Sequence, residues 1–144
     1  MGLKLLSTDK IFLDTSPFIY FFEENPAYIE KLGNLFDRIY AGGIPIITSI
    51  ITYIELLIYP EKTGAKKLAA KYRESLINSE FISVYPMNLP VADTAVTLRV
   101  KYSLKTPDAI QVATAVVCGA DYVITNDRKW KKIKDVNVVL ISEI

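Results

Sequence analysis

Four acidic residues occupy positions from which they could act on one substrate: Asp14, Glu55, Asp108 and Asp127. Asp14 ends the apolar run IFLD, and Asp127 follows the apolar run YVIT after one further residue. Carboxylates that gather in one cleft repel each other unless a cation joins them, and ligation by oxygen alone suits Mg²⁺ or Mn²⁺. A cation held in this way activates water and stabilises the charge that develops on phosphorus, so we expect metal-assisted phosphoryl transfer.

The residue types that are missing narrow the chemistry further. The 144 residues contain no histidine, which excludes Ser-His-Asp and Cys-His catalysis and every histidine-ligated zinc site. Glu55 lies in the segment ITSIITYIELLIY, and neither lysine nor arginine occurs from residue 39 to residue 61. We expect the helix around Glu55 to be largely buried, so that its carboxylate needs either a cation or a distant basic partner.

Short apolar runs alternate with helical patterns along the whole chain, with no linker between them. We expect strands at 11–14, 44–48, 81–85, 122–125 and 137–141. We expect helices at 16–22, 27–40, 49–59, 62–79, 89–104 and 107–118, with Pro60 ending the third of them. This order predicts one α/β domain over residues 1–144, a three-layer α/β/α sandwich with a five-stranded parallel sheet.

Such a fold should bring the four acids together, because ligands bind at the carboxyl ends of parallel strands. Structural interpretations stay open for each acid. Asp14, Asp108 and Asp127 could cap helices or complement helix dipoles, and Glu55 could pair with a distant lysine. The neighbouring polar residues could orient the carboxylates or a metal-linked water, or could simply form turns; they are Thr15, Ser16, Thr125 and Asn126.

A basic segment follows Asp127 directly, in the sequence NDRKWKKIKD. Its cations could neutralise nucleic acid phosphates beside the acidic site, or could form a solvated surface. The candidates for nucleic acid binding are Lys105, Arg128, Lys129, Lys131 and Lys132. Trp130 could stack on an unpaired base, although packing in the core is the more usual role for such a residue.

Overall composition sets broader limits. The net charge is +1, the single cysteine cannot form an internal disulfide, and no apolar run approaches the roughly 20 residues that span a bilayer. With no signal-peptide pattern at the N-terminus, we expect a cytoplasmic protein. A mean hydropathy of +0.24 indicates a large core, extended in our interpretation by a buried interface in a homodimer.

The sequence resembles the PIN-domain nucleases, and most closely the VapC-type toxins of toxin–antitoxin pairs. The matching segments are IFLDTSPFIYFF, ITSIITYIELL, TPDAIQVATAVVCGADYVITNDRKW and VVLISEI, in the order of that family. The resemblance implies a Mg²⁺- or Mn²⁺-dependent endoribonuclease acting on single-stranded RNA, with the four acids as metal ligands and catalytic residues. It also implies a cognate antitoxin protein as a partner and commonly a homodimer.

Other functions stay open at this point. A housekeeping RNA-processing nuclease could use the same site, and a catalytically silent module could bind RNA or protein without turnover. A receiver domain fits poorly, because no acid ends the third expected strand, in SVYPMN. A haloacid-dehalogenase-type phosphatase also fits poorly, because Ser16 stands where a second aspartate would be expected.

Overall fold

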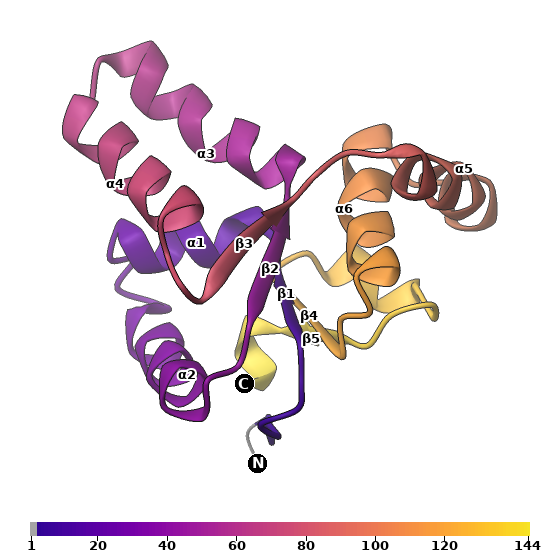
Figure 1. Ribbon diagram of the computed structural model, residues 1–144, viewed down its shortest axis with the longest axis horizontal. Coiled ribbons are helices and arrows are strands. Elements are labelled where there is room, and N and C mark those ends of the chain that lie inside the picture. Colours follow the sequence, from indigo (N-terminus) through magenta and orange to yellow (C-terminus); the bar gives the residue numbers. More distant parts are fainter. Residues whose placement is uncertain (1–2) are drawn as a thin grey trace.

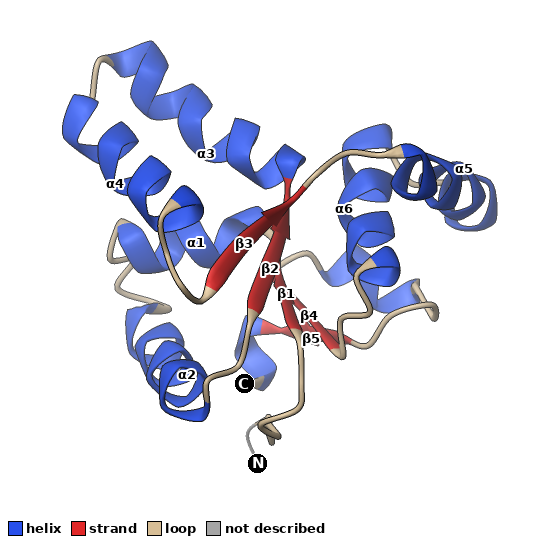
Figure 2. Ribbon diagram, viewed as in Figure 1, coloured by secondary structure: helices blue, strands red, loops and turns tan. Residues whose placement is uncertain are grey.

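The structure is a computed structural model that describes residues 3–144, and its centre is a five-stranded parallel sheet (Figure 2). The strands are β1 (Ile11–Leu13), β2 (Ile46–Ser49), β3 (Ile82–Tyr85), β4 (Tyr122–Thr125) and β5 (Val138–Leu140). Their order across the sheet is β3-β2-β1-β4-β5, so β1 lies in the middle between β2 and β4. The five expected strands are therefore confirmed, with ends shifted by at most two residues.

Helices cover both faces of this sheet, which confirms the predicted α/β/α sandwich (Figure 1). One face carries α1 (Thr15–Phe22), α2 (Ile29–Gly42), α3 (Ile50–Thr63) and α4 (Lys66–Ile77). The other face carries α5 (Leu89–Tyr102), α6 (Thr106–Val117) and the 3₁₀ helix η1 (Arg128–Lys132), and the chain ends with η2 (Ile141–Glu143). No helix in residues 3–144 has the length and apolar character needed to cross a bilayer.

Two separate cores form because successive side chains of a strand point to opposite faces. In β1, Ile11 and Leu13 pack with α1 to α4, whereas Phe12 packs with α5, α6 and η1. All three side chains are fully buried. This central strand therefore anchors both layers, and its carboxyl end delivers Asp14 to the edge of the sheet.

Pro60 does not end α3, contrary to the expectation from the sequence. The helix continues to Thr63 and ends at Gly64, which adopts φ +71°. A proline removes only one backbone donor from a helix. The Pro60 ring is buried, and its carbonyl accepts a hydrogen bond of 2.9 Å from Ala65 N at the helix end. Packing and this capping bond keep the last turn in place, so α4 begins later than expected.

Candidate active site

Asp14 is fixed at the point where β1 ends and α1 begins. Its Oδ1 accepts a hydrogen bond of 2.7 Å from Thr15 N, so Asp14 does cap α1. Its Oδ2 accepts a hydrogen bond of 2.7 Å from the hydroxyl of Thr125, which ends the neighbouring strand β4. Capping and a functional role are compatible here, because both bonds also hold the carboxylate in one orientation.

A pocket of about 360 Å³ opens beside Asp14. Its lining includes three of the four predicted acids, Asp14, Glu55 and Asp127, with no lysine or arginine. The remaining lining residues are Thr15, Ser16, Ile19, Tyr20 and Asn126. Three of the four acids, distant from one another in sequence, therefore line one pocket at the carboxyl edge of the sheet, whereas Asp108 does not line it.

Glu55 reaches this pocket from the second turn of α3. Its Oε1 accepts a hydrogen bond of 2.9 Å from the hydroxyl of Thr15. The expectation that its helix is largely buried was wrong: Glu55 is exposed, and Ile58 and Tyr59 are 58% and 61% exposed. Only one side of α3, with Leu56 and Leu57, packs against the sheet. The argument that burial alone demands a cation at Glu55 therefore does not hold.

The other two of the four acids are Asp108, on α6, and Asp127, which precedes η1. Asp108 lies half-buried in the first turn of α6 and does not line the pocket. Burial raises its pKa, the charge of Asp127 raises it further, and Lys105 and Lys129 oppose the rise. Asp127 accepts a hydrogen bond of 2.9 Å from Lys129 N and so caps η1, as one interpretation of the sequence proposed. The charge of Asp108 raises the pKa of Asp14, although Asp108 does not line the pocket.

The pKa of Asp14 is raised to about 6, chiefly because its carboxyl group is buried. The negative charges of Glu55 and Asp108 also raise it. The hydrogen bonds from Thr125 and from Thr15 N act in the opposite direction. Burial disfavours the ionised form of this carboxyl group. A positive charge placed in the pocket would stabilise that ionised form.

The donor set fits a hard divalent cation that keeps part of its water shell. The ion pairs of residues 3–144 are Arg73–Glu61, Lys101–Asp135 and Lys131–Glu143, and none involves the four acids. In the same part of the chain, no three acidic side chains converge closely enough to form a ready-made metal cage. The hydroxyl of Ser16, which lines the pocket, is buried and has no hydrogen-bond partner. Mg²⁺ is usually bound through one or two carboxylates and several waters, which suits this spacing and this free hydroxyl.

The four polar companions predicted from the sequence have different roles. Thr125 and Thr15 bond to Asp14 and Glu55 respectively, and Ser16 lines the pocket. Asn126 also lines the pocket, but its amide lies 3.4 Å from the hydroxyl of Tyr20 rather than against an acid. Two of the four companions therefore orient carboxylates directly.

The predicted basic residues surround η1 and the start of α6. Lys105, Arg128, Lys129 and Lys132 are exposed, and none of them pairs with an acid within residues 3–144. Lys131 differs, because its Nζ lies 2.7 Å from Glu143 and also donates to Val138 O. Trp130 is 1% exposed and packs under η1, so it is a core residue and is not available for stacking on a base.

The sequence analysis missed one residue of this site, Gln111. It lies on α6, one turn after Asp108, and is 1% exposed. Its Nε2 is 3.1 Å from Asp14 Oδ1 and 3.4 Å from Glu55 Oε1. The available signal was an amide within the apolar segment AIQVATAVV, three residues beyond an acid and hence on the same helical face.

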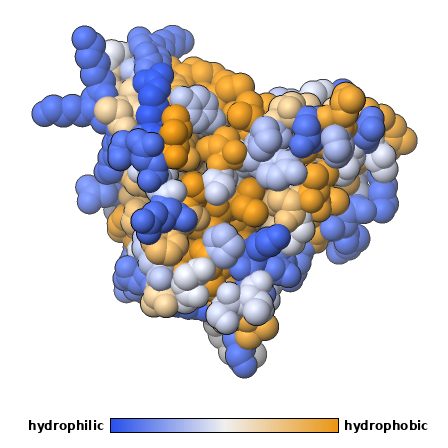
Figure 3. Space-filling view, viewed as in Figure 1, coloured by the Kyte–Doolittle hydropathy of each residue, from blue (hydrophilic) through white to orange (hydrophobic). Residues whose placement is uncertain are grey.

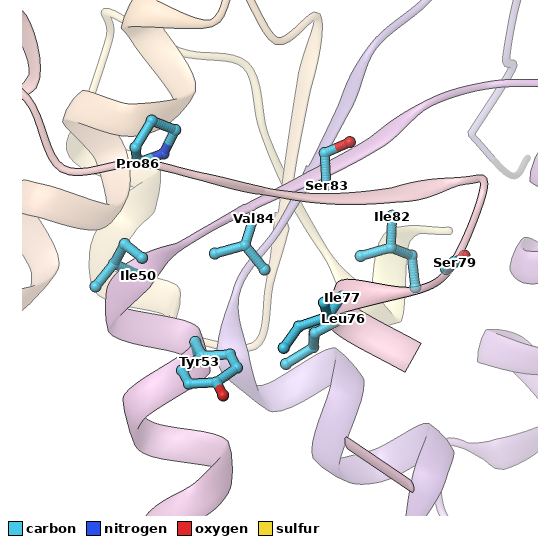
Figure 4. A pocket seen from close by; sticks show the side chains of 9 residues that line it. All are labelled: Ile50, Tyr53, Leu76, Ile77, Ser79, Ile82, Ser83, Val84 and Pro86. Carbon is cyan, nitrogen blue, oxygen red and sulfur yellow. The ribbon is translucent and has the colours of Figure 1, made fainter. Parts of the chain in front are cut away.

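A larger pocket of about 470 Å³ lies elsewhere, between α3, α4 and the edge strand β3 (Figure 4). Its lining carries no acidic or basic side chain and is mostly apolar, with Tyr53, Leu76 and Val84 among its residues. It offers no group for acid–base or metal chemistry. The smaller acidic pocket is therefore the candidate active site.

Comparison with known proteins supports the α/β/α fold described above. A family model described as PIN domain matches residues 11–136. A chain in the structure of VapBC2 from Rickettsia felis bound to a DNA fragment from their promoter is 18% identical, with a TM-score of 0.75, covering 91% of this chain and 98% of that chain. A comparison with curated proteins found no match.

Two further solved structures show the same fold. A chain of a toxin–antitoxin complex from Klebsiella pneumoniae is 24% identical, with a TM-score of 0.71, covering 93% of this chain and 99% of that chain. A chain of DNA-bound VapBC from Salmonella typhimurium is 21% identical, with a TM-score of 0.73 and the same two coverages. At these identities the likeness establishes the fold.

Proposed function

Because the chain belongs to the PIN domain family, we propose that it is a divalent-metal-dependent endoribonuclease that cleaves single-stranded RNA. The observation that carries this proposal is the acidic pocket at the ends of β1 and β4, where Asp14, Glu55 and Asp127 meet without a basic partner. We take residues 1–144 as one catalytic domain. The proposed products carry 5′-phosphate and 3′-hydroxyl ends.

Asp14, Glu55 and Asp127 would hold Mg²⁺ or Mn²⁺, directly or through waters, with Asp108 adding negative field from α6. When bound, the cation supplies activation of water and stabilisation of negative charge on the phosphate. The protein keeps the carboxylates oriented through the hydroxyls of Thr15 and Thr125. A carboxylate that is already held in one orientation does not have to reorganise during the reaction. Such preorganisation favours catalysis.

The exposed basic residues give the substrate a place to bind. Lys105 and Lys129 lie close enough to Asp108 to affect its pKa, and Arg128 and Lys132 continue along η1. Positive charges beside an acidic pocket offset its repulsion of a phosphate backbone. We propose that RNA crosses this basic border and places one phosphodiester over the pocket.

We further propose that the protein acts as the toxin of a toxin–antitoxin pair, as a homodimer in the cytoplasm. The support is the likeness in fold to chains of VapBC complexes and the exposed apolar surface. Figure 3 shows hydrophobic side chains gathered across the centre of one face of the molecule. Exposed apolar residues include Ile54 and Ile58 on α3 and Leu89, Val96 and Val100 on α5. Apolar surface of this kind marks protein interfaces.

The test is cleavage of single-stranded RNA in Mg²⁺, in EDTA, and by the variant Asp14→Asn. Of these three reactions, we expect cleavage only in the one that contains the wild type and Mg²⁺. Asp37→Asn, an exposed acid on α2, is the matched control and should cleave normally. Cleavage that persists in EDTA would contradict metal dependence, whereas tight RNA binding without turnover would favour a silent binding module.

A separate experiment distinguishes a toxin from a housekeeping RNA-processing nuclease. Expression of the wild type should arrest growth, and co-expression of the product of an adjacent gene should relieve the arrest. Expression of Asp14→Asn should not arrest growth. If an active wild-type nuclease leaves growth unaffected, the housekeeping function is the correct one.

A further inference from the structure

We propose that Gln111 is a positioning residue that holds the carboxylates of Asp14 and Glu55 in a fixed relation, as an uncharged bridge between them. This inference rests on the proposed function, because it concerns how the same acids are prepared for a cation. Gln111 Nε2 lies within 3.4 Å of an oxygen of each carboxylate. No lysine or arginine pairs with either acid in residues 3–144, so the hydrogen-bond donors to these two carboxylates are uncharged groups.

The orientation of the amide is set by the start of α3. Ser49 Oγ caps that helix by accepting a hydrogen bond from Thr52 N at 3.3 Å, so its own proton is free to be donated. It donates this proton to Gln111 Oε1, and Thr52 Oγ1 approaches the same oxygen at 3.3 Å. With Oε1 accepting from these hydroxyls, Nε2 is the end of the amide whose N–H groups can donate to the acids. The reverse orientation would place a carbonyl oxygen against two carboxylates.

The amide has more acceptors around it than protons to give. Nε2 also lies 2.9 Å from Thr52 Oγ1 and 3.2 Å from Thr15 Oγ1, yet it carries only two N–H donors. Thr15 Oγ1 in turn donates to Glu55 Oε1. The bridge is therefore a small network in which threonine hydroxyls share the donors, and every member of it is held by a neighbour.

A neutral bridge has a specific advantage at a cation site. A lysine between Asp14 and Glu55 would neutralise them and compete with the metal ion for the same oxygens. An amide donates to the carboxylates without a positive charge, so their negative charge stays available. Groups that hydrogen-bond to metal ligands typically change metal affinity about 10- to 100-fold when removed.

The test measures Mn²⁺ binding to the full chain, from the electron paramagnetic resonance signal of free Mn²⁺, alongside the thermal midpoint of each variant. Gln111→Met keeps the length and removes the donors, and we expect it to weaken Mn²⁺ binding by about tenfold or more. Thr114→Val is the matched control. Thr114 is also buried on α6, but its hydroxyl donates to Ile110 O within the helix rather than to an acid.

Two further variants make the result specific. Gln111→Asn retains the amide but is one methylene too short to reach both acids, so its Mn²⁺ binding should also weaken; it stands in if Gln111→Met does not fold. In a Glu55→Gln background, Gln111→Met should have a smaller effect on Mn²⁺ affinity than in the wild type, because the bridge has lost one of its carboxylates.

The outcomes separate this inference from the proposed function. Wild-type Mn²⁺ affinity in folded Gln111→Met, or an equal loss in Thr114→Val, overturns the positioning role alone. A wild-type protein with no Mn²⁺ binding that depends on Asp14 overturns the proposed function, and this inference with it.

Discussion

The Thr125 hydroxyl donates a hydrogen bond of 2.7 Å to Asp14 Oδ2, linking the carboxyl ends of two neighbouring parallel strands. Thr125 is fully buried, and its oxygen also accepts a hydrogen bond of 3.0 Å from Asp127 N. One hydroxyl thus connects two acids of the candidate site. This bond lowers the pKa of Asp14 against the opposing effect of burial.

Replacing Thr125 with valine should reduce nuclease activity at least tenfold and lower stability by about 1–3 kcal/mol, because a buried carboxylate loses a hydrogen bond. Activity is measured as the initial rate of RNA cleavage and stability by urea unfolding. Thr48→Val is the control, since the buried hydroxyl of Thr48 donates to Leu13 O rather than to an acid. Equal loss of activity in both variants would show that Thr125 acts only through the stability of the sheet.

The raised pKa of Asp14 predicts how stability depends on pH without metal. Folding favours the protonated form of this carboxyl group, so its contribution is fully present below pH 4 and is lost as pH rises through about 6. In EDTA, Asp14→Asn should therefore gain stability relative to the wild type between pH 4 and pH 7.5, by up to about 3 kcal/mol. Urea unfolding across this range measures the difference, and a constant difference would contradict the prediction.

The basic border predicts a salt-dependent affinity for RNA. Arg128→Ala with Lys132→Ala should weaken binding of single-stranded RNA and reduce the slope of log affinity against log salt by roughly 0.7 for each phosphate that is no longer neutralised. Fluorescence anisotropy at several salt concentrations measures both quantities. The control is Lys66→Ala with Lys67→Ala on α4, which also removes two exposed charges. An equal change in slope for the control pair would indicate that only net charge matters.

Trp130 should matter for stability and not for RNA recognition, because it is buried beneath η1. Trp130→Ala should destabilise the protein by about 3–5 kcal/mol. Trp130→Phe, which keeps an aromatic side chain of smaller volume, should lose less stability and retain RNA affinity where the protein is folded. A marked loss of RNA affinity in folded Trp130→Phe would contradict this prediction and indicate that Trp130 takes part in RNA binding.

The sequence predicted the sheet well because its strands carry a local signature. Ile11 to Leu13 and Tyr122 to Thr125 are short, apolar and bounded by polar residues, which is typical of strands buried on both faces. These strand patterns alone predict that Asp14 and Asp127 lie at the same edge of the sheet. The predicted end of α3 was wrong. The tendency of Pro60 to end a helix was outweighed by packing and capping that only the folded chain supplies.

By itself, the sequence determined the order of the elements, the absence of histidine chemistry and the placing of Asp14 and Asp127 at one edge of the sheet. Only the tertiary structure decided that Glu55 is exposed, that Trp130 is buried, and that Gln111 lies between Asp14 and Glu55. The physical reason is that periodicity along a chain reports which side chains share a face. Which faces become covered, and which polar groups meet inside, depends on elements far away in the sequence.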